Sequence, residues 1–344
     1  MSEDILFEIR GRCGVVTLNR PKALNALTRD MLIAFSKQVK AWDADPAVER
    51  IVIRGAGDRA FCAGGDVVSL YHAGKDNHEA FTGFFWDEYR ADYLTSILSK
   101  PYVALVDGIV MGGGVGLSVH GPYRVVTDKT LFAMPETGIG LIPDVGGTHL
   151  LGHMPGQAGV YLGLLGERLK AADCLHVGIG THYVPSEKIE ALLEALVTDG
   201  SPVEDILARF HEDPGAAPLI EHQAEIDRLF AGDTVEDIAA ALQEAGEWGA
   251  GLRERLLGLS PTSLKLTLRA VRAGAQLDLA GCLRQEYRLV CHIRHGHDFY
   301  EGVRAQLVDK DRSPKWNPAT LADVSADALD RYFAPPEGGD LQFD

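Results

Sequence analysis

The segment YVALVDGIVMGGGVGLSVH, residues 102–120, decides the fold class of this chain. Its first part, YVALVDG at 102–108, is a short apolar run with β-branched residues, which predicts a buried strand. The glycine cluster GGGVG at 112–116 follows almost directly and predicts the start of a short helix. A buried strand that leads into a helix is typical of an α/β fold whose sheet is parallel or largely parallel.

Short strands and helices alternate on both sides of this segment. Further strands are predicted at ILFEIRG (5–11), GVVTLNR (14–20), IVIRG (51–55), RVVTD (124–128) and LFAM (131–134), and helices from the N-cap Thr28 to about Ala44 and near 78–98. From about residue 186 the pattern is helical, at 187–197, 236–259 and 263–274. We therefore expect residues 1–200 to form a core that carries the active site and residues 201–344 to form a helical region packed on it.

Composition and charge narrow the range of partners. The 344 residues are 46% hydrophobic and 24% charged, and the formal net charge of −16 argues against nucleic acid or an anionic membrane as a partner. The N-terminus MSEDILFEIRGR lacks a signal or transit pattern, and no apolar run approaches the roughly 20 residues that cross a bilayer. Five scattered cysteines fit free thiols in a reducing compartment, so a cytoplasmic location is predicted.

Two glycine clusters can bring backbone N–H groups to a ligand. AGGD at 63–66 follows a predicted strand, and Gly65 has no Cβ to keep a ligand oxygen away. A tight turn capped by Asp66 is the simpler alternative for that cluster. GGGVG at 112–116 lacks the full spacing of a dinucleotide-binding motif, which leaves close helix packing or a site for a developing oxyanion as its interpretations.

One glutamate of the long predicted helix interrupts an aromatic stripe. At helical spacing Glu88 falls on the face formed by Phe81, Phe84 and Phe85. A carboxyl group in such a stripe must be paired, protonated or in contact with a ligand. Asp92 shares this face, so the alternative is that the stripe simply ends at the surface.

Two further acids are the only charges in MPETGIGLIPDVGG, residues 134–147. Glu136 and Asp144 each follow a proline, which fixes the backbone locally. A pair of acids in apolar surroundings fits a general base or nucleophile with a second polar group, unless each acid merely caps a short helix. The histidine-rich segment CHIRHGH at 291–297 stands alone as a cluster, so a structural or surface role is predicted for it and no metal is expected.

In this order and spacing, AFCAGGD (60–66), MGGGVGLS (111–118) and MPETGIGLIPDVGGT (134–148) resemble the crotonase, or enoyl-CoA hydratase/isomerase, superfamily. The resemblance covers nearly the whole chain. The block HDFYEGVRAQLVDKDRSPKWNPATL at 297–321 is similar to a branch of that family that hydrolyses thioesters. The resemblance implies an α/β fold of the crotonase-like ββα superhelix type with a helical C-terminal extension.

The resemblance also implies roles for individual residues. The backbone N–H groups of Gly65 and Gly113 would form an oxyanion hole for the thioester carbonyl. Glu136 would be the nucleophile or general base, with Asp144 as its partner acid. Glu88 would contact the substrate, so that Glu88, Gly113, Glu136 and Asp144 together bind it.

The coenzyme A moiety is expected on the loop after the second strand. Candidate contacts are the side chains of Arg20 and Lys22 and the backbone around Ala23, Leu24 and Ala63. An acyl-CoA is therefore the expected partner, and no separate cofactor is expected because CoA is part of the substrate. Members of the superfamily often form trimers and hexamers, but longer C-terminal helices can cover the same surface, so a homo-oligomer stays open.

The implied reaction is hydrolysis of the thioester of a short 3-hydroxyacyl-CoA, first of all 3-hydroxyisobutyryl-CoA in valine breakdown. Hydratases of this superfamily carry a second glutamate two residues after the GGG run, where this chain has Gly116, so hydratase activity is not expected. An enoyl-CoA isomerase or another acyl-CoA enzyme on the same fold remains an alternative, as does a CoA-binding protein without catalysis. The sequence does not distinguish the 3-hydroxyisobutyryl group from 3-hydroxypropionyl, which is one methyl group smaller.

Overall fold

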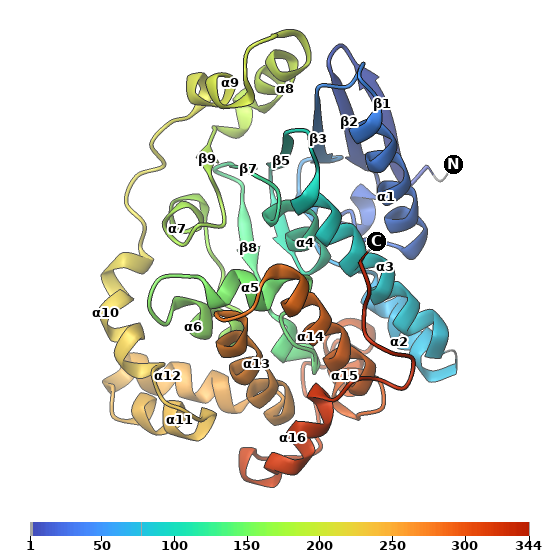
Figure 1. The fold of residues 1–344 in the computed structure, drawn as a ribbon. Helices are drawn as coiled ribbons and strands as arrows, with labels where there is room; N and C mark the ends of the chain where they lie inside the picture. The colour runs from blue at the N-terminus through green and yellow to red at the C-terminus, as the bar shows by residue number, and fades with distance from the viewer. Residues whose placement is uncertain (1–2, 77, 344) are drawn as a thin grey trace. The chain divides into compact units, whose positions relative to one another are not determined.

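Six strands form one sheet in the order β1-β2-β3-β5-β7-β9 (Figure 1). In the computed structural model, which describes residues 3–76 and 78–343, these strands are β1 (Ile5–Arg10), β2 (Cys13–Leu18), β3 (Arg50–Gly55), β5 (Tyr102–Val106), β7 (Tyr123–Val126) and β9 (His182–Tyr183). β1 pairs with β2 in antiparallel fashion and every later pair is parallel. The prediction of a largely parallel sheet is confirmed.

A second, three-stranded sheet holds the glycine clusters. Its order is β4 (Ala60–Cys62), β6 (Ile109–Met111) and β8 (Leu131–Ala133), and β4 and β6 run parallel. Because the carboxyl ends of parallel strands meet at one edge, the segments that follow them lie close together. A Cβ added to Gly64 would lie 3.6 Å from the Cα of Gly112. The sheet thus brings the two predicted glycine segments side by side.

The described residues fall into two compact units that alternate along the sequence. Unit 1 consists of Met1–Gly65, Asp87–Phe132 and Arg168–Ile220, and unit 2 of Asp66–Trp86, Ala133–Glu167 and Glu221–Asp344. Both units therefore draw on each half of the chain. The expected division into a core over 1–200 and a helical region over 201–344 stays a prediction.

Helices cover the sheet of unit 1. They are α1 (Arg29–Ala44), the C-terminal part of α3 (His78–Ile97), α4 (Gly113–Val119), α7 (Ala171–His176), α8 (Ile189–Thr198) and α9 (Val203–Phe210). The apolar faces of α8 and α9 pack on the buried valines and leucines of β2, β3, β5 and β7. Thr28 is the N-cap of α1 as predicted, since its side chain accepts a hydrogen bond from the Met31 N–H at 3.3 Å.

Unit 2 is built from helices and turns. They are α2 (Val67–Asp76), α5 (Gly147–Gly152), α6 (Ala158–Leu165), most of α10 (Leu219–Leu229), α11 (Val235–Gln243), α12 (Gly246–Leu257), α13 (Pro261–Gly274), α14 (Leu279–Ile293), α15 (Asp298–Val303) and α16 (Ala326–Phe333). The prediction of one continuous helix over 236–259 is wrong. The chain breaks it after Gln243 and resumes at Gly246, whose φ of +67° belongs to the left-handed region.

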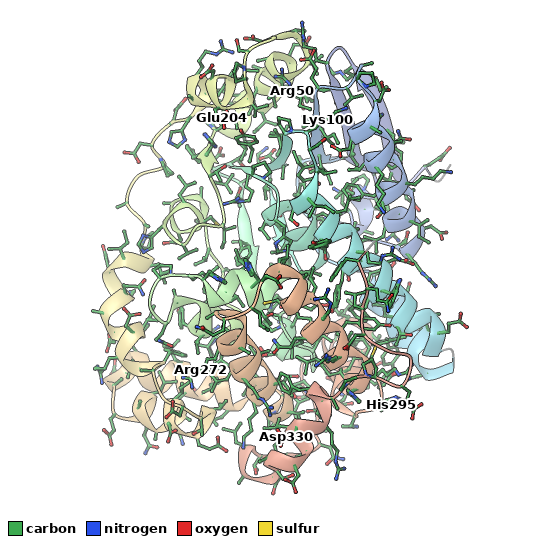
Figure 2. All side chains as sticks on the ribbon, in the orientation of Figure 1. Arg50, Lys100, Glu204, Arg272, His295 and Asp330 are labelled. Atoms are coloured by element: carbon green, nitrogen blue, oxygen red, sulfur yellow. The ribbon has the colours of Figure 1, made fainter. Side chains whose placement is uncertain are left out.

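Polar contacts tie the helices of unit 2 to one another. Arg269 of α13 pairs with Asp330 of α16 at 2.6 Å. Arg272 of α13 donates to the carbonyl oxygens of Ala231 and Asp233 in the turn before α11. Figure 2 labels Arg272 and Asp330 among the side chains. Among the described residues, no helix is both long enough and apolar enough to cross a membrane.

Candidate active site

In unit 1, the glycines of α4 face two carboxyl groups of α3. A Cβ added to Gly113 would overlap with Oε1 of Glu88, and one added to Gly116 would overlap with the whole carboxyl group of Asp92. Glu88 and Asp92 lie one helical turn apart and are 2% and 0% exposed. The structure thus places Glu88 beside Gly113, and the alternative that the stripe ends at the surface with Asp92 is wrong.

The backbone of the two glycine segments is held in place by the neighbouring chain. Gly65 forms an isolated parallel bridge with Leu27, whose N–H donates to the Gly64 carbonyl at 2.9 Å. Gly113 is the first residue of α4 and follows Gly112, which has a φ of +46°. The N–H of a first helical residue has no acceptor within its own helix, so that of Gly113 is suited to polarise a ligand oxygen.

The loop expected to bind CoA is a rigid turn. Leu24 and Asn25 both have positive φ, and Asn25 is fully buried. The Asn25 amide donates to the carbonyl oxygens of Ala56 and Ala60 at 2.9 Å each, and its oxygen accepts from the Arg20 N–H. The Ala63 N–H donates to the Leu24 carbonyl at 3.0 Å, which joins this loop to the AGGD turn.

Of the two basic residues predicted to bind CoA, one is engaged within the loop and the other is exposed. One guanidinium nitrogen of Arg20 donates to the Ala26 carbonyl at 2.6 Å, so this side chain supports the loop. Lys22 is exposed and lies in the 3-10 helix Pro21–Ala23. Asn25 was not among the predicted residues, although an asparagine that tolerates left-handed backbone after a proline turn is a recognisable signal.

In unit 2, Glu136 is a buried carboxyl group at the start of a turn. It opens the 3-10 helix Glu136–Ile139 directly after Pro135, and it is 5% exposed. Within the described chain, its Oε2 atom has no hydrogen-bond partner. Burial, and then the charge of Asp144, raise the pKa of Glu136 well above its usual range, while its own backbone N–H lowers it. A carboxyl group with a raised pKa is a candidate for proton transfer in a reaction.

Asp144 stands before a turn with unusual backbone geometry. Val145 has a φ of +56° and Gly146 a φ of +76°, so two successive residues are left-handed. The N-cap of α5 is Gly146, which has no side chain with which to cap the helix. Asp144 is therefore not the N-cap residue of this helix. Asp144 is 3% exposed, and its charge contributes to the raised pKa of Glu136, so the structure brings these two predicted residues together.

The carboxyl group that does hold this turn comes from Glu286 of α14, which the sequence analysis missed. Its Oε2 accepts from the Gly146 N–H at 2.7 Å, and its Oε1 accepts from the Thr148 N–H at 2.9 Å and the Thr148 hydroxyl at 2.5 Å. Burial raises the pKa of Glu286 to about 8, although these hydrogen bonds lower it. Glu286 falls on the apolar face of its helix with Leu283 and Val290, so the reasoning that singled out Glu88 also finds it.

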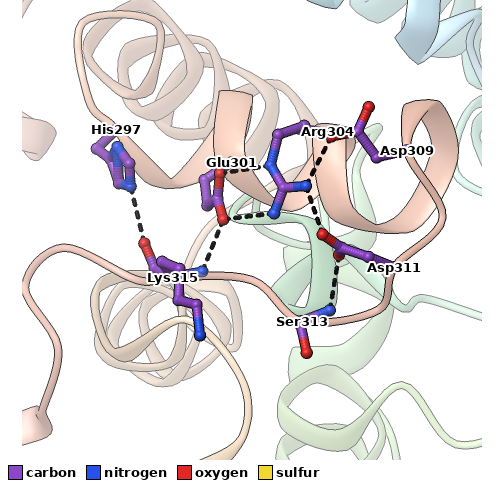
Figure 3. Close-up of polar contacts among 7 residues, drawn as sticks. All are labelled: His297, Glu301, Arg304, Asp309, Asp311, Ser313 and Lys315. Carbon is purple, nitrogen blue, oxygen red and sulfur yellow. Dashed lines mark hydrogen bonds and ion pairs between the residues drawn. The ribbon is translucent and has the colours of Figure 1, made fainter.

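The C-terminal block forms a set of ion pairs around Arg304 (Figure 3). Glu301 binds the Arg304 guanidinium through both carboxylate oxygens at 2.8 Å, and Asp309 and Asp311 each accept from its Nη1 at 2.7 Å. The Lys315 N–H donates to Glu301 as well. These contacts fasten the segment 309–315 to α15. Among the described residues, no group of three or more His, Cys, Asp or Glu side chains is arranged to hold a metal ion.

Residues 13–333 match the family model for enoyl-CoA hydratase/isomerase. The chain belongs to this family. Similar curated relatives are the mitochondrial 3-hydroxyisobutyryl-CoA hydrolases of Danio rerio, with 48% identity over 98% of this chain and 91% of the relative, and of Homo sapiens, with 45% identity over 99% and 91%. The resemblance stated from the three motifs is therefore confirmed over nearly the full length.

Solved structures of the family confirm the crotonase-like α/β fold with its helical C-terminal region. A carnitinyl-CoA dehydratase from Mycobacterium thermoresistibile superposes with a TM-score of 0.95 at 45% identity, covering 100% of this chain and 99% of the other. An enoyl-CoA hydratase from Rhodobacter sphaeroides superposes with a TM-score of 0.93 at 38% identity, covering 99% and 100%.

The prediction of a cytoplasmic location is wrong. The vertebrate family members that match nearly the whole chain are named as mitochondrial proteins. All five cysteines are free and buried.

Proposed function

We propose that this protein hydrolyses the thioester of 3-hydroxyisobutyryl-CoA to 3-hydroxyisobutyrate and free CoA. The observation that carries the proposal is the buried Glu136, which has one carboxyl oxygen without a partner in the described chain and lies under the influence of Asp144. The names of the similar relatives support the same reaction. No cofactor is needed, because CoA is part of the substrate.

Two routes lead from Glu136 to the same products. In the first, its carboxylate attacks the thioester carbon, the C–S bond breaks, and the thiolate leaves and takes a proton; water then cleaves the resulting anhydride. In the second, Glu136 accepts a proton from a water molecule that attacks the carbonyl directly; the C–S bond then breaks, and the leaving thiolate takes that proton. In both routes the N–H groups of Gly65 and Gly113 would stabilise the oxyanion, and losing one such donor typically costs about 3–4 kcal/mol of transition-state stabilisation.

The remaining residues are proposed to select and orient the substrate. Asp144 would orient the water or the substrate hydroxyl, and Glu88 would accept a hydrogen bond from that hydroxyl. A buried acceptor for a hydroxyl group discriminates strongly against acyl groups that lack one. Lys22 is proposed to bind a phosphate of CoA, with the loop around Ala23, Leu24 and Ala63 as the adjoining surface.

Water addition to an enoyl-CoA is the competing reaction, since two similar solved structures are titled as a hydratase and a dehydratase. A hydratase glutamate at position 116 has no room here, because Asp92 occupies the space that its side chain would need. Hydration would therefore require Asp92 itself to supply the second acid. This requirement makes hydrolysis the simpler reaction for this chain.

The test is thiol release, measured with a chromogenic disulfide, from 3-hydroxyisobutyryl-CoA, 3-hydroxypropionyl-CoA, crotonyl-CoA and a 3-enoyl-CoA in parallel. We expect rapid release from the hydroxyacyl substrates and none from the enoyl substrates. One methyl group is worth about 1–3 kcal/mol in a pocket, so the two hydroxyacyl substrates should differ by about 5-fold to 150-fold in kcat/KM. Loss or movement of the enoyl double bond without thiol release would show that the protein catalyses hydration or isomerisation instead of hydrolysis.

A further inference from the structure

The turn from Asp144 to Thr148 is held by its own backbone only in part, through the Gly147 N–H, which donates to the Asp144 carbonyl at 2.6 Å. Val145 is β-branched and left-handed, a combination that the backbone adopts only under outside constraint. Gly146, the N-cap of α5, has no side chain with which to accept the first helical N–H groups. The backbone N–H groups of Gly146 and Thr148 find their acceptors on another element.

Glu286 supplies that constraint from another helix. Its two carboxyl oxygens bind the N–H groups of Gly146 and Thr148 at 2.7 and 2.9 Å, on either side of Gly147. A third hydrogen bond, from the Thr148 hydroxyl at 2.5 Å, fixes the rotation of the carboxyl group. Both Glu286 and Thr148 are fully buried. Three hydrogen bonds to one rigid, desolvated group leave the turn little freedom.

We propose that Glu286 is a positioning residue, which sets the orientation of Asp144 and through it the efficiency of thioester hydrolysis. The catalytic part of the inference rests on the role proposed for Asp144. The structural part, that Glu286 restrains the left-handed turn, does not depend on any activity. The left-handed backbone at Gly146 does not suit a capping serine or aspartate, and the remote carboxyl group also anchors the turn to α14.

The first experiment measures amide hydrogen exchange in the protein without substrate. In Glu286→Gln the side chain keeps one acceptor oxygen but turns an NH2 group toward a former donor, so one hydrogen bond is lost. We expect the amides of Gly146 and Thr148 to exchange at least about 10-fold faster than in the wild type. Asp173→Asn is the matched control, because Asp173 is also a buried carboxyl group that accepts a backbone N–H, that of Leu219 at 2.8 Å. Unchanged exchange at Gly146 and Thr148 in Glu286→Gln would overturn the inference.

The second experiment is a double-mutant cycle with Asp144→Asn. We expect Glu286→Gln to lower kcat about 10-fold to 100-fold, the scale of a small misplacement of a reacting group, with KM changed less than about 3-fold. In the Asp144→Asn background the same change should have almost no further effect on kcat, because the two residues act as a unit. Effects that multiply would show that Glu286 does not act through Asp144.

Thr148→Val is a second variant, which tests the same proposal if Glu286→Gln folds poorly. This change keeps the Thr148 N–H bond to Glu286 and removes the hydroxyl with its contacts to Glu286 and Cys282, so we expect the same pattern at about 2-fold to 5-fold in kcat. A wild-type protein that releases no thiol, while Glu286→Gln still speeds exchange at Gly146, would overturn the proposed hydrolysis and leave the restraint by Glu286 supported. The two failures are therefore distinguishable.

Discussion

The α3–α4 pair of unit 1 and the α5–α14 pair of unit 2 both bury carboxyl groups, but they accommodate them in different ways. Between α3 and α4, glycines at 113 and 116 leave out side chains so that the carboxyl groups of Glu88 and Asp92 have space. Between α5 and α14, backbone N–H groups donate to Glu286. The first arrangement should be sensitive to added atoms, and the second to the loss of an acceptor or to a change of charge.

Glu136 belongs to neither arrangement, and its replacement should have the largest effect. Glu136→Gln removes the base or nucleophile, so we expect thiol release to fall by about 10²-fold to 10⁴-fold. The thermal unfolding midpoint should not fall, because a neutral amide replaces a buried acid whose Oε2 has no partner in the described chain. A variant that keeps a tenth or more of the wild-type activity would remove Glu136 from the mechanism.

Gly116→Ala should show the sensitivity of unit 1 to added atoms. Its Cβ would overlap with the buried Asp92 carboxyl group, so we expect a loss of about 1–3 kcal/mol in the free energy of unfolding, the usual cost of overpacking. Gly138→Ala is the matched control, because its Cβ would lie 3.7 Å from Leu259 Cδ2, an ordinary contact. Urea unfolding measures both, and equal losses would contradict the comparison.

The dependence of stability on pH should report on Glu286. Its folded pKa is about 8, whereas an unfolded glutamate titrates near about 4.3, so the folded state holds more protons between these values. The stabilisation associated with the protonated group is complete below about pH 4.3 and is lost as the pH rises through about 8.

Glu286→Gln should flatten this part of the profile, measured by urea unfolding between pH 5 and 9. Glu136 has a raised pKa of the same sign, and its Gln variant serves as the comparison. Asp144 and Cys282 are the titratable neighbours that interact with Glu286, and the thiol of Cys282 has a pKa near 12, above this window. An unchanged slope in Glu286→Gln would show that the carboxyl group is ionised throughout.

The smallest effect is expected where carboxylates are held by an arginine near the surface. Arg304→Met removes the partner of Glu301, Asp309 and Asp311, so the segment 309–315 should become easier for a protease to cut. Thiol release should stay near the wild-type rate. Limited proteolysis followed by the thiol assay tests both statements, and a large loss of activity would assign this network a role in the reaction.

Local patterns were enough to predict an α/β fold with a largely parallel sheet, whereas the crotonase-like fold was predicted from the resemblance to the family. β2, β3 and β5 are almost entirely apolar, as strands of a covered parallel sheet must be, and the Thr28 cap marks the start of α1. The break between α11 and α12 was not predicted, because the helical pattern of α12 begins at Gly246, only three residues after α11 ends at Gln243. A single left-handed residue leaves little trace in apolar periodicity.

The candidate site was predictable only where an acid stood out from its own surroundings in sequence. Glu136 and Asp144 did so in a segment without other charges. Glu286 lies on the apolar face of its helix, so periodicity can single it out, but its partner Gly146 is 140 positions away in the sequence. Its function as a remote cap depends on tertiary contact, which no local pattern encodes.

The fit of Asp92 into the space at Gly116 also limits how this protein can change by single mutations. A glutamate at 116 would collide with Asp92, so it becomes tolerable only after Asp92 has been replaced by a smaller residue. Replacing Asp92 first leaves a cavity beside a buried glycine and gains nothing by itself. The two substitutions are therefore epistatic, and a route from this acid arrangement to one with a glutamate on α4 passes through an intermediate of lowered stability.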